Sequence, residues 1–133
     1  MKFESLLKIS KIEEEELKIE INSIQERLAT IDGEITKTLS LLKECEKVID
    51  NPSNFILSIS SLNHISVLQQ KINDLNNRKK DVLIEFNKIN NKLIDKKAER
   101  KGFEKLINKQ IQQIKKEQEK KEQIFLDDLN SKD

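Results

Sequence analysis

The sequence predicts an all-α fold, an antiparallel two-helix coiled-coil hairpin with a longer C-terminal helix. Two runs of inward positions, from Leu17 to Ile49 and from Ile65 to Ile114, advance by alternating steps of four and three residues. Such steps average about 3.5 residues and keep one face of a helix turned toward a partner helix. The composition agrees, because a chain with 37% charged residues, two Gly, one Pro and no Trp is typical of long helices.

The first helix is expected over about residues 3–50. Its inward positions recur without a break and are mostly Ile and Leu: Leu17, Ile21, Ile24, Leu28, Ile31, Ile35, Thr38, Leu42, Cys45 and Ile49. Pro52 cannot continue a helix and restricts the residue before it. The first helix should therefore stop near Asp50.

A tip loop is expected over about residues 51–61, where Pro, Asn and Ser are frequent. Asn and Ser side chains compete for backbone hydrogen bonds, and Ser60 or Ser61 is the expected N-cap of the next helix. Four residues here are too apolar for a solvated loop: Phe55, Ile56, Leu57 and Ile59. They either form a short helix folded onto the tip or meet a partner. We expect the first arrangement.

The second helix is expected over about residues 62–130. In an antiparallel pair, facing residues have numbers that add to a constant, and the constant 110 matches apolar layers with apolar layers. The same register sets Glu14 opposite Lys96 and Ser10 opposite Arg100. A shift by one heptad would turn Glu14 toward an apolar residue, so this polar layer is expected to set the register.

The two helices are expected to carry opposite charge. Residues 1–50 have 8 Lys plus Arg and 12 Asp plus Glu, a balance of −4, whereas residues 51–133 have 17 and 12, a balance of +5. Each exposed pair contributes only about 0.2–1 kcal/mol. Glutamates 13–16 point around the helix instead of converging on a metal ion. We expect them to pair with basic residues of the second helix: Lys96, Lys97, Arg100 and Lys101.

The second helix is expected to project beyond the hairpin from about residue 109. The projecting part ends in an apolar cluster that has nothing in the chain to pack on: Ile124, Phe125, Leu126 and Leu129. This cluster is either a frayed end or an anchor that inserts into another protein. We favour the anchor, because exposed Phe and Leu side chains make a poor solvated terminus.

The sequence offers no catalytic, cofactor-binding or metal site. Cys45 is the only cysteine and His64 the only histidine, and the chain has no glycine-rich phosphate loop. Lys and Arg are interleaved with acids and lack aromatic stacking residues, which argues against nucleic-acid binding. No apolar run approaches the roughly 20 residues that span a bilayer, so we expect no membrane insertion. A cytoplasmic location is the default expectation.

Several segments resemble the FliJ family of flagellar type III export proteins and the related YscO-like secretion stalk proteins. They are Ala98 to Leu106 (AERKGFEKL), Lys115-Lys116-Glu117, and Glu119 to Asp128 (EKKEQIFLDD). The family is also similar in length, in its helix-loop-long-helix plan, and in a C-terminal helix that outlasts the first. The resemblance covers the plan of the whole chain.

The resemblance implies a non-enzymatic stalk that binds in the pore of a hexameric, FliI-like export ATPase, contacts an FlhA-like export gate and escorts export chaperones. It implies a cytoplasmic location, peripheral to the membrane-embedded export apparatus. The ring contact would fall on eight residues: Lys115, Lys116, Lys120, Lys121, Ile124, Phe125, Leu126 and Leu129. The gate contact would fall on four residues: Leu62, His64, Val67 and Leu68.

Two other functions require the same hairpin. One is a generic coiled-coil adaptor, and the other is a prefoldin-like holding chaperone whose client surface lies at apolar helix ends. The residues by themselves also leave open whether the system is flagellar or a related virulence secretion apparatus.

Overall fold

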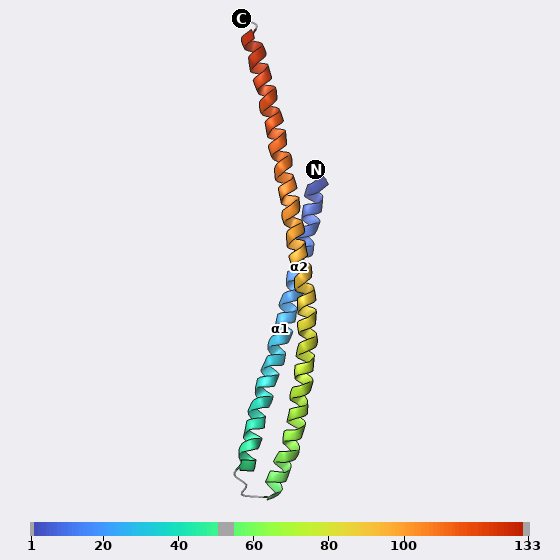
Figure 1. Ribbon diagram of the computed structural model, residues 1–133, viewed down its shortest axis with the longest axis vertical. Coiled ribbons are helices and arrows are strands. Elements are labelled where there is room, and N and C mark those ends of the chain that lie inside the picture. The colour runs from blue at the N-terminus through green and yellow to red at the C-terminus, as the bar shows by residue number, and fades with distance from the viewer. Residues whose placement is uncertain (1, 51–54, 132–133) are drawn as a thin grey trace. The chain divides into compact units, whose positions relative to one another are not determined.

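A computed structural model describes residues 2–50 and 55–131 of the chain. Helix α1 spans Lys2–Asp50 and helix α2 spans Phe55–Ser131 (Figure 1). Every described residue belongs to one of these two helices, and no strand occurs among them. The expected all-α hairpin of two long helices, with the second the longer, is confirmed.

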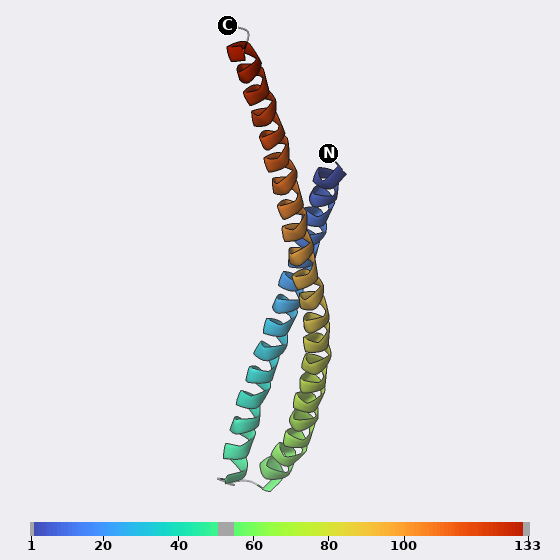
Figure 2. The same ribbon diagram turned by 45° about the horizontal axis from the view of Figure 1, so that its top comes forward.

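Contacts between residues divide the chain into two compact units. The first unit contains residues Met1–Leu17 and Lys92–Asp133, and the second contains residues Lys18–Asn91. In the second unit, α1 and α2 run antiparallel and side by side, as both ribbon views show (Figures 1 and 2). The two units are described in turn below.

The core of the second unit consists of Ile24, Ile31, Leu75 and Val82, all less than 9% exposed. Four partly buried residues pack against it: Leu28, Ile35, Phe86 and Ile89. Six of these side chains form three facing pairs in the register in which residue numbers add to 110: Ile24 with Phe86, Leu28 with Val82, and Ile35 with Leu75. The seam is one side chain deep on each helix, so every inward position matters for its stability.

Polar side chains within this seam find local partners. Thr38 is only 2% exposed, and its Oγ1 donates a hydrogen bond of 2.7 Å to the backbone carbonyl of Glu34. This bond to the preceding turn removes most of the cost of burying a hydroxyl. Lys79 lies opposite Ile31 in the register, and its Nζ reaches the edge of the seam to pair with Asp32 at 2.7 Å.

Helix α2 begins at Phe55, whereas the sequence placed the start at about residue 62. Ser60 and Ser61 therefore lie inside the helix, and the expectation that one of them is the N-cap is wrong. The first four residues of the expected tip loop, which include Pro52, lie outside the described residues. Ser58 and Ser61 are half-buried and continue the steps of the seam upstream of Ile65, which is why helix persists here.

Buried polar side chains characterise the first unit. Ser10 and Glu14 are 2% and 4% exposed. Arg100 Nε donates to Glu14 Oε2 at 2.6 Å, and the other side of the guanidinium donates to Glu104 at 3.0 Å. Lys96 pairs with Glu13 and Glu99. We call these residues the polar cluster: Ser10, Glu13, Glu14, Lys96, Glu99, Arg100 and Glu104.

The pairs of Glu13 with Lys96 and of Glu14 with Arg100 agree with the expected pairing of glutamates 13–16 with basic residues of α2, but the facing layers are offset. Glu14 pairs with Arg100 instead of Lys96, and Ser10 Oγ donates to Glu99 at 3.4 Å instead of facing Arg100. Side chains on a helix lean toward its N-terminus. On antiparallel helices Glu14 and Arg100 therefore lean toward each other from adjacent layers.

The charges of the polar cluster reinforce one another. The hydrogen bond from Lys96 holds the pKa of the Glu99 carboxyl below its ordinary value. Hydrogen bonds to Glu13 and then Glu99 raise the pKa of Lys96, and the bond to Glu14 raises that of Arg100. Lys96, Glu99 and Arg100 therefore stay ionised around neutral pH.

Side-chain burial on α2 ends at Gln110, which is half-buried. All inward positions of both sequence runs are buried or half-buried except the last one, Ile114, which is 47% exposed. From Ile111 to Ser131 every residue is exposed. We call residues 111–131 the C-terminal segment.

Gly33 and Gly102 are expected to limit stability. Both lie in helix interiors, and a Cβ added at either would meet nothing within 4 Å. Gly33→Ala and Gly102→Ala should each raise the free energy of unfolding by about 1 kcal/mol, because Ala is the better helix former. Urea titration followed by circular dichroism measures this. Ala29→Gly, at an exposed position of α1, should lower stability by about the same amount; a loss of stability in either alanine variant would contradict the prediction.

Removing one partner of the Glu14–Arg100 pair should lower the free energy of unfolding more than removing both partners does. Arg100→Leu takes the guanidinium from a carboxylate that is 6% exposed, and we expect about 2–4 kcal/mol of destabilisation. The double variant Glu14→Leu with Arg100→Leu should unfold within about 1 kcal/mol of the wild type or be more stable. Chemical denaturation of both variants gives the comparison. Additive losses would show that the pair is not coupled.

Candidate partner-binding surfaces

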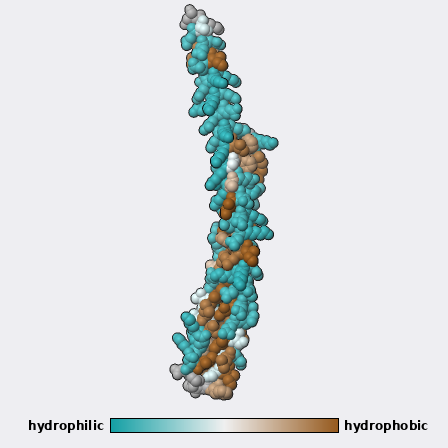
Figure 3. All heavy atoms as spheres, in the orientation of Figure 1, coloured by the Kyte–Doolittle hydropathy of each residue, from teal (hydrophilic) through white to brown (hydrophobic). Residues whose placement is uncertain are grey.

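An exposed apolar surface covers the start of α2. Residues 51–70 contain no Asp, Glu, Lys or Arg, although 37% of the chain is charged. Six residues of α2 in this stretch are between 44% and 78% exposed: Phe55, Ile56, Leu57, Ile59, Leu62 and Val67. We call them the uncharged face. Figure 3 shows hydrophobic residues gathered where α1 ends and α2 begins. Contiguous exposed apolar residues of this kind mark sites of protein association.

The uncharged face overlaps the expected gate contact only in part. Leu62, His64 and Val67 are exposed. Leu68 is 5% exposed and belongs to the seam, where it supports the face from below. His64 Nδ1 lies 3.9 Å from Cys45 Sγ, a contact that connects α2 to α1.

Four residues of the uncharged face were not predicted as contact residues: Phe55, Ile56, Leu57 and Ile59. They were expected to fold onto the tip, but α2 turns them outward. The sequence signal that identifies them is the lack of charged residues from 51 to 70. A helix surface exposed to water usually carries Lys or Glu at such positions.

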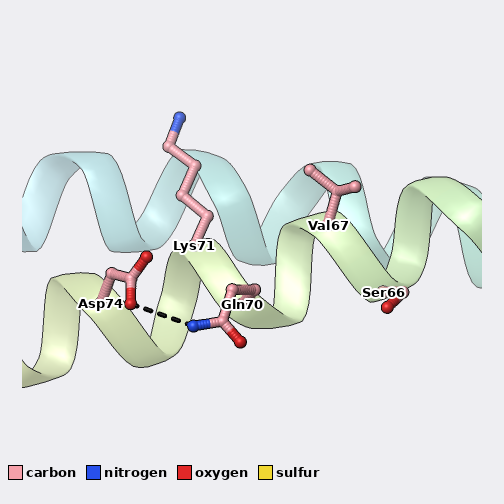
Figure 4. Close-up of a pocket in the computed structure, with 5 residues that line it drawn as sticks. All are labelled: Ser66, Val67, Gln70, Lys71 and Asp74. Carbon is pink, nitrogen blue, oxygen red and sulfur yellow. Dashed lines mark hydrogen bonds between the residues drawn. The ribbon is translucent and has the colours of Figure 1, made fainter.

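Beyond Val67 the surface of α2 becomes polar. Figure 4 shows Ser66, Gln70 and Asp74 on one side of α2 and Val67 and Lys71 on the other. Gln70 Nε2 donates to Asp74 Oδ1 at 3.1 Å, which is a bond within one helix turn. These side chains do not converge on a point, so they form no site for a small ligand.

The C-terminal segment is the second exposed surface. All eight residues expected to contact an ATPase ring are exposed, and the apolar ones among them are between 49% and 63% exposed. Gln123 donates to Asp127 at 3.1 Å within the same helix. Nothing else in the described part of the chain covers this segment. Its hydrophobic side chains are therefore available to another protein.

The described residues show no cluster of metal-ligating side chains. No group of three or more His, Cys, Asp or Glu among them could hold a metal ion. Among the described residues, the ionisable groups with a shifted pKa belong to the polar cluster, which joins the two helices. Neither described helix is long and apolar enough to cross a membrane.

Comparison with known proteins assigns the family. The family model described as "Flagellar FliJ protein" matches residues 1–132, nearly the whole chain. No curated protein and no solved structure matches significantly. The match agrees with two long helices, of which the second is the longer. The chain thus belongs to the FliJ family and is a component of the flagellar protein export apparatus.

Proposed function

We propose that this protein is a non-enzymatic central stalk of the flagellar export apparatus that also escorts export chaperones. In this proposal the C-terminal segment binds in the pore of the hexameric export ATPase, and the uncharged face contacts the export gate. The observation that carries the proposal is the exposure of every residue from Ile111 to Ser131 in a helix that is continuous with the hairpin. Family membership supplies the setting.

The C-terminal segment has the properties that a pore contact requires. It contains 21 residues, and at 1.5 Å per residue it measures about 32 Å. Its first half carries Lys115, Lys116, Lys120 and Lys121 among glutamates, so its polar contacts with a ring are adjustable. Its second half carries Ile124, Phe125, Leu126 and Leu129, which supply apolar area for firm attachment.

A single helix inside a six-fold ring cannot contact all six subunits equally. Subunits that touch the helix are stabilised in the conformation that binds it better, and the others are not. The helix thereby biases the ring toward an asymmetric set of states without itself catalysing anything. Stimulation of ATP hydrolysis is the expected consequence.

The uncharged face suits a partner with an apolar, weakly charged surface. Phe55 is 78% exposed and is the largest side chain of the face. Aromatic residues that insert into a pocket commonly dominate binding energies, with polar surroundings contributing little. His64 and the serines between the apolar residues provide polar edges. We assign this face to the export gate.

Removing the C-terminal segment should abolish the effect on the ATPase. A chain truncated after Gln110 loses no residue that is buried among the described ones, so its helical circular dichroism per residue should be preserved. Stimulation of hydrolysis by a purified export ATPase should fall to the basal rate. Phe125→Ala with Leu129→Ala should give an intermediate loss, because it removes only the apolar part of the contact. Full stimulation by the truncated chain would refute the stalk proposal.

Polar substitution of the uncharged face should weaken gate binding selectively. Phe55→Ser with Leu57→Ser should raise the dissociation constant for the cytoplasmic part of the gate about tenfold or more, a change of about 1.4 kcal/mol. Isothermal titration calorimetry measures it. Ile19→Ser, at a 63% exposed position of α1, is the matched control and should have no effect.

The same variants separate the stalk from a holding chaperone. A prefoldin-like protein would suppress aggregation of unrelated unfolded proteins through its apolar helix ends. We expect no such suppression by the wild type. Suppression that disappears in Phe55→Ser with Leu57→Ser would favour the chaperone function instead.

A further inference from the structure

The C-terminal segment carries a pattern that fits a second copy of itself. We propose that two copies of this chain pair through their C-terminal segments, antiparallel, in a weak and reversible dimer. The pairing stands on the residues of the segment alone. Its consequence for the ATPase rests on the proposed function above.

The seam spacing of α2 continues past the end of the hairpin contacts. Steps of three and four lead from Gln110 through Ile114, Glu117, Lys121 and Ile124 to Asp128. The five positions after Gln110 are all exposed. A helix face with coiled-coil spacing and no partner in the chain is a face prepared for another helix.

Antiparallel pairing with a second copy matches this face layer by layer. When facing residue numbers add to 238, Ile114 meets Ile124 of the second copy, and Glu117 meets Lys121 of the second copy. Symmetry repeats both layers. Flanking positions on one side of the seam pair at a sum of 236, which sets Ile111 near Phe125 of the second copy. At each end of the seam Gln110 meets Asp128 of the second copy. Apolar residues face apolar residues, and opposite charges face each other.

The charge of the whole segment favours the same orientation. Residues 110–116 carry two Lys and no acid, a balance of +2, whereas residues 122–128 carry one Glu and two Asp, a balance of −3. In the antiparallel register that adds to 238, residues 110–116 of each copy lie on residues 122–128 of the other, so the basic stretch meets the acidic one. Antiparallel packing also opposes the two helix dipoles favourably.

Other arrangements are disfavoured by the same residues. A parallel pair in register would face Glu117 with Glu117, Lys121 with Lys121 and Asp128 with Asp128, three layers of like charge. Antiparallel registers shifted by one heptad would face Ile114 with Glu117 or Lys121 with Ile124. Each of these arrangements places a charged side chain against an apolar one or against a charge of the same sign.

The dimer should be weak, and its weakness has a use. The contact contains four apolar pairs and two charged layers, so we expect a dissociation constant between about 10 µM and 1 mM. Pairing covers Ile124, Phe125 and Lys121, which the proposed function assigns to the ATPase ring. Self-pairing and ring binding would therefore exclude each other. In chains that are not bound to the ring, pairing would cover the ring-binding side chains and keep them from contacting other proteins.

Charge reversal tests the pairing on the full chain by sedimentation equilibrium. Glu117→Lys and Lys121→Glu should each weaken the dimer about tenfold or more, because each sets like charges together in both charged layers. An equal mixture of the two variants should associate as well as the wild type, since each layer then pairs Lys with Glu again. Glu119→Lys is the matched control, because it makes the same charge change off the seam and should shift the dissociation constant less than about twofold.

Thiol cross-linking tests the orientation. In a Cys45→Ser background, a mixture of Ile114→Cys and Ile124→Cys chains should be joined by a short bis-maleimide, and either chain alone should not. Self-linking of either single variant would overturn the antiparallel arrangement. A wild-type chain that stays monomeric at about 1 mM, or charge variants that all behave alike, would overturn the pairing itself. Stimulation of the ATPase by the same wild-type preparation would show that the proposed function survives that outcome.

Discussion

A seam one side chain deep is the constraint on which this structure depends. Two helices have no third layer to cover them, so each inward residue meets only the opposite helix. In the unit of residues Lys18–Asn91 this seam is almost entirely Ile, Leu and Val, with Thr38 and Lys79 satisfied by local partners. Regular spacing, and not a thick core, is what makes these long helices stable.

The polar cluster shows how such a seam acquires a unique alignment. Hydrophobic layers of similar size tolerate a slip of seven residues, because one Ile is replaced by another. Glu14 is 4% exposed and holds the guanidinium of Arg100, which no neighbouring heptad could supply. Buried ion pairs add little net stability, yet they penalise wrong alignments strongly. Specific alignment is therefore the contribution of this cluster.

Helix α2 has two exposed surfaces, and both lie where its apolar side chains have no partner on α1. At the start of α2, serines occupy the inward positions and the apolar residues turn outward, which creates the uncharged face. Beyond Gln110, α2 continues without α1 beside it, which leaves Ile124 and Phe125 exposed. The family of this protein places it in the flagellar protein export apparatus. The two exposed surfaces differ in chemistry, one without charge and one rich in alternating charge, and so suit different partners.

The sequence by itself determined the two helices, their antiparallel pairing and the inward residues, because a spacing of three and four residues is a local property that a single helix already expresses. The register that adds to 110 also predicted that α2 projects beyond the hairpin from about residue 109, and side-chain burial on α2 does end at Gln110. Only the tertiary structure decided which of the expected basic residues pairs with Glu14. Arg100 does, because the side chains of opposing helices lean toward each other from adjacent layers. The tertiary structure likewise decided that Phe55, Ile56 and Leu57 face outward. The inward positions here are Ser58 and Ser61, and a search for apolar spacing does not recognise serines as part of the seam.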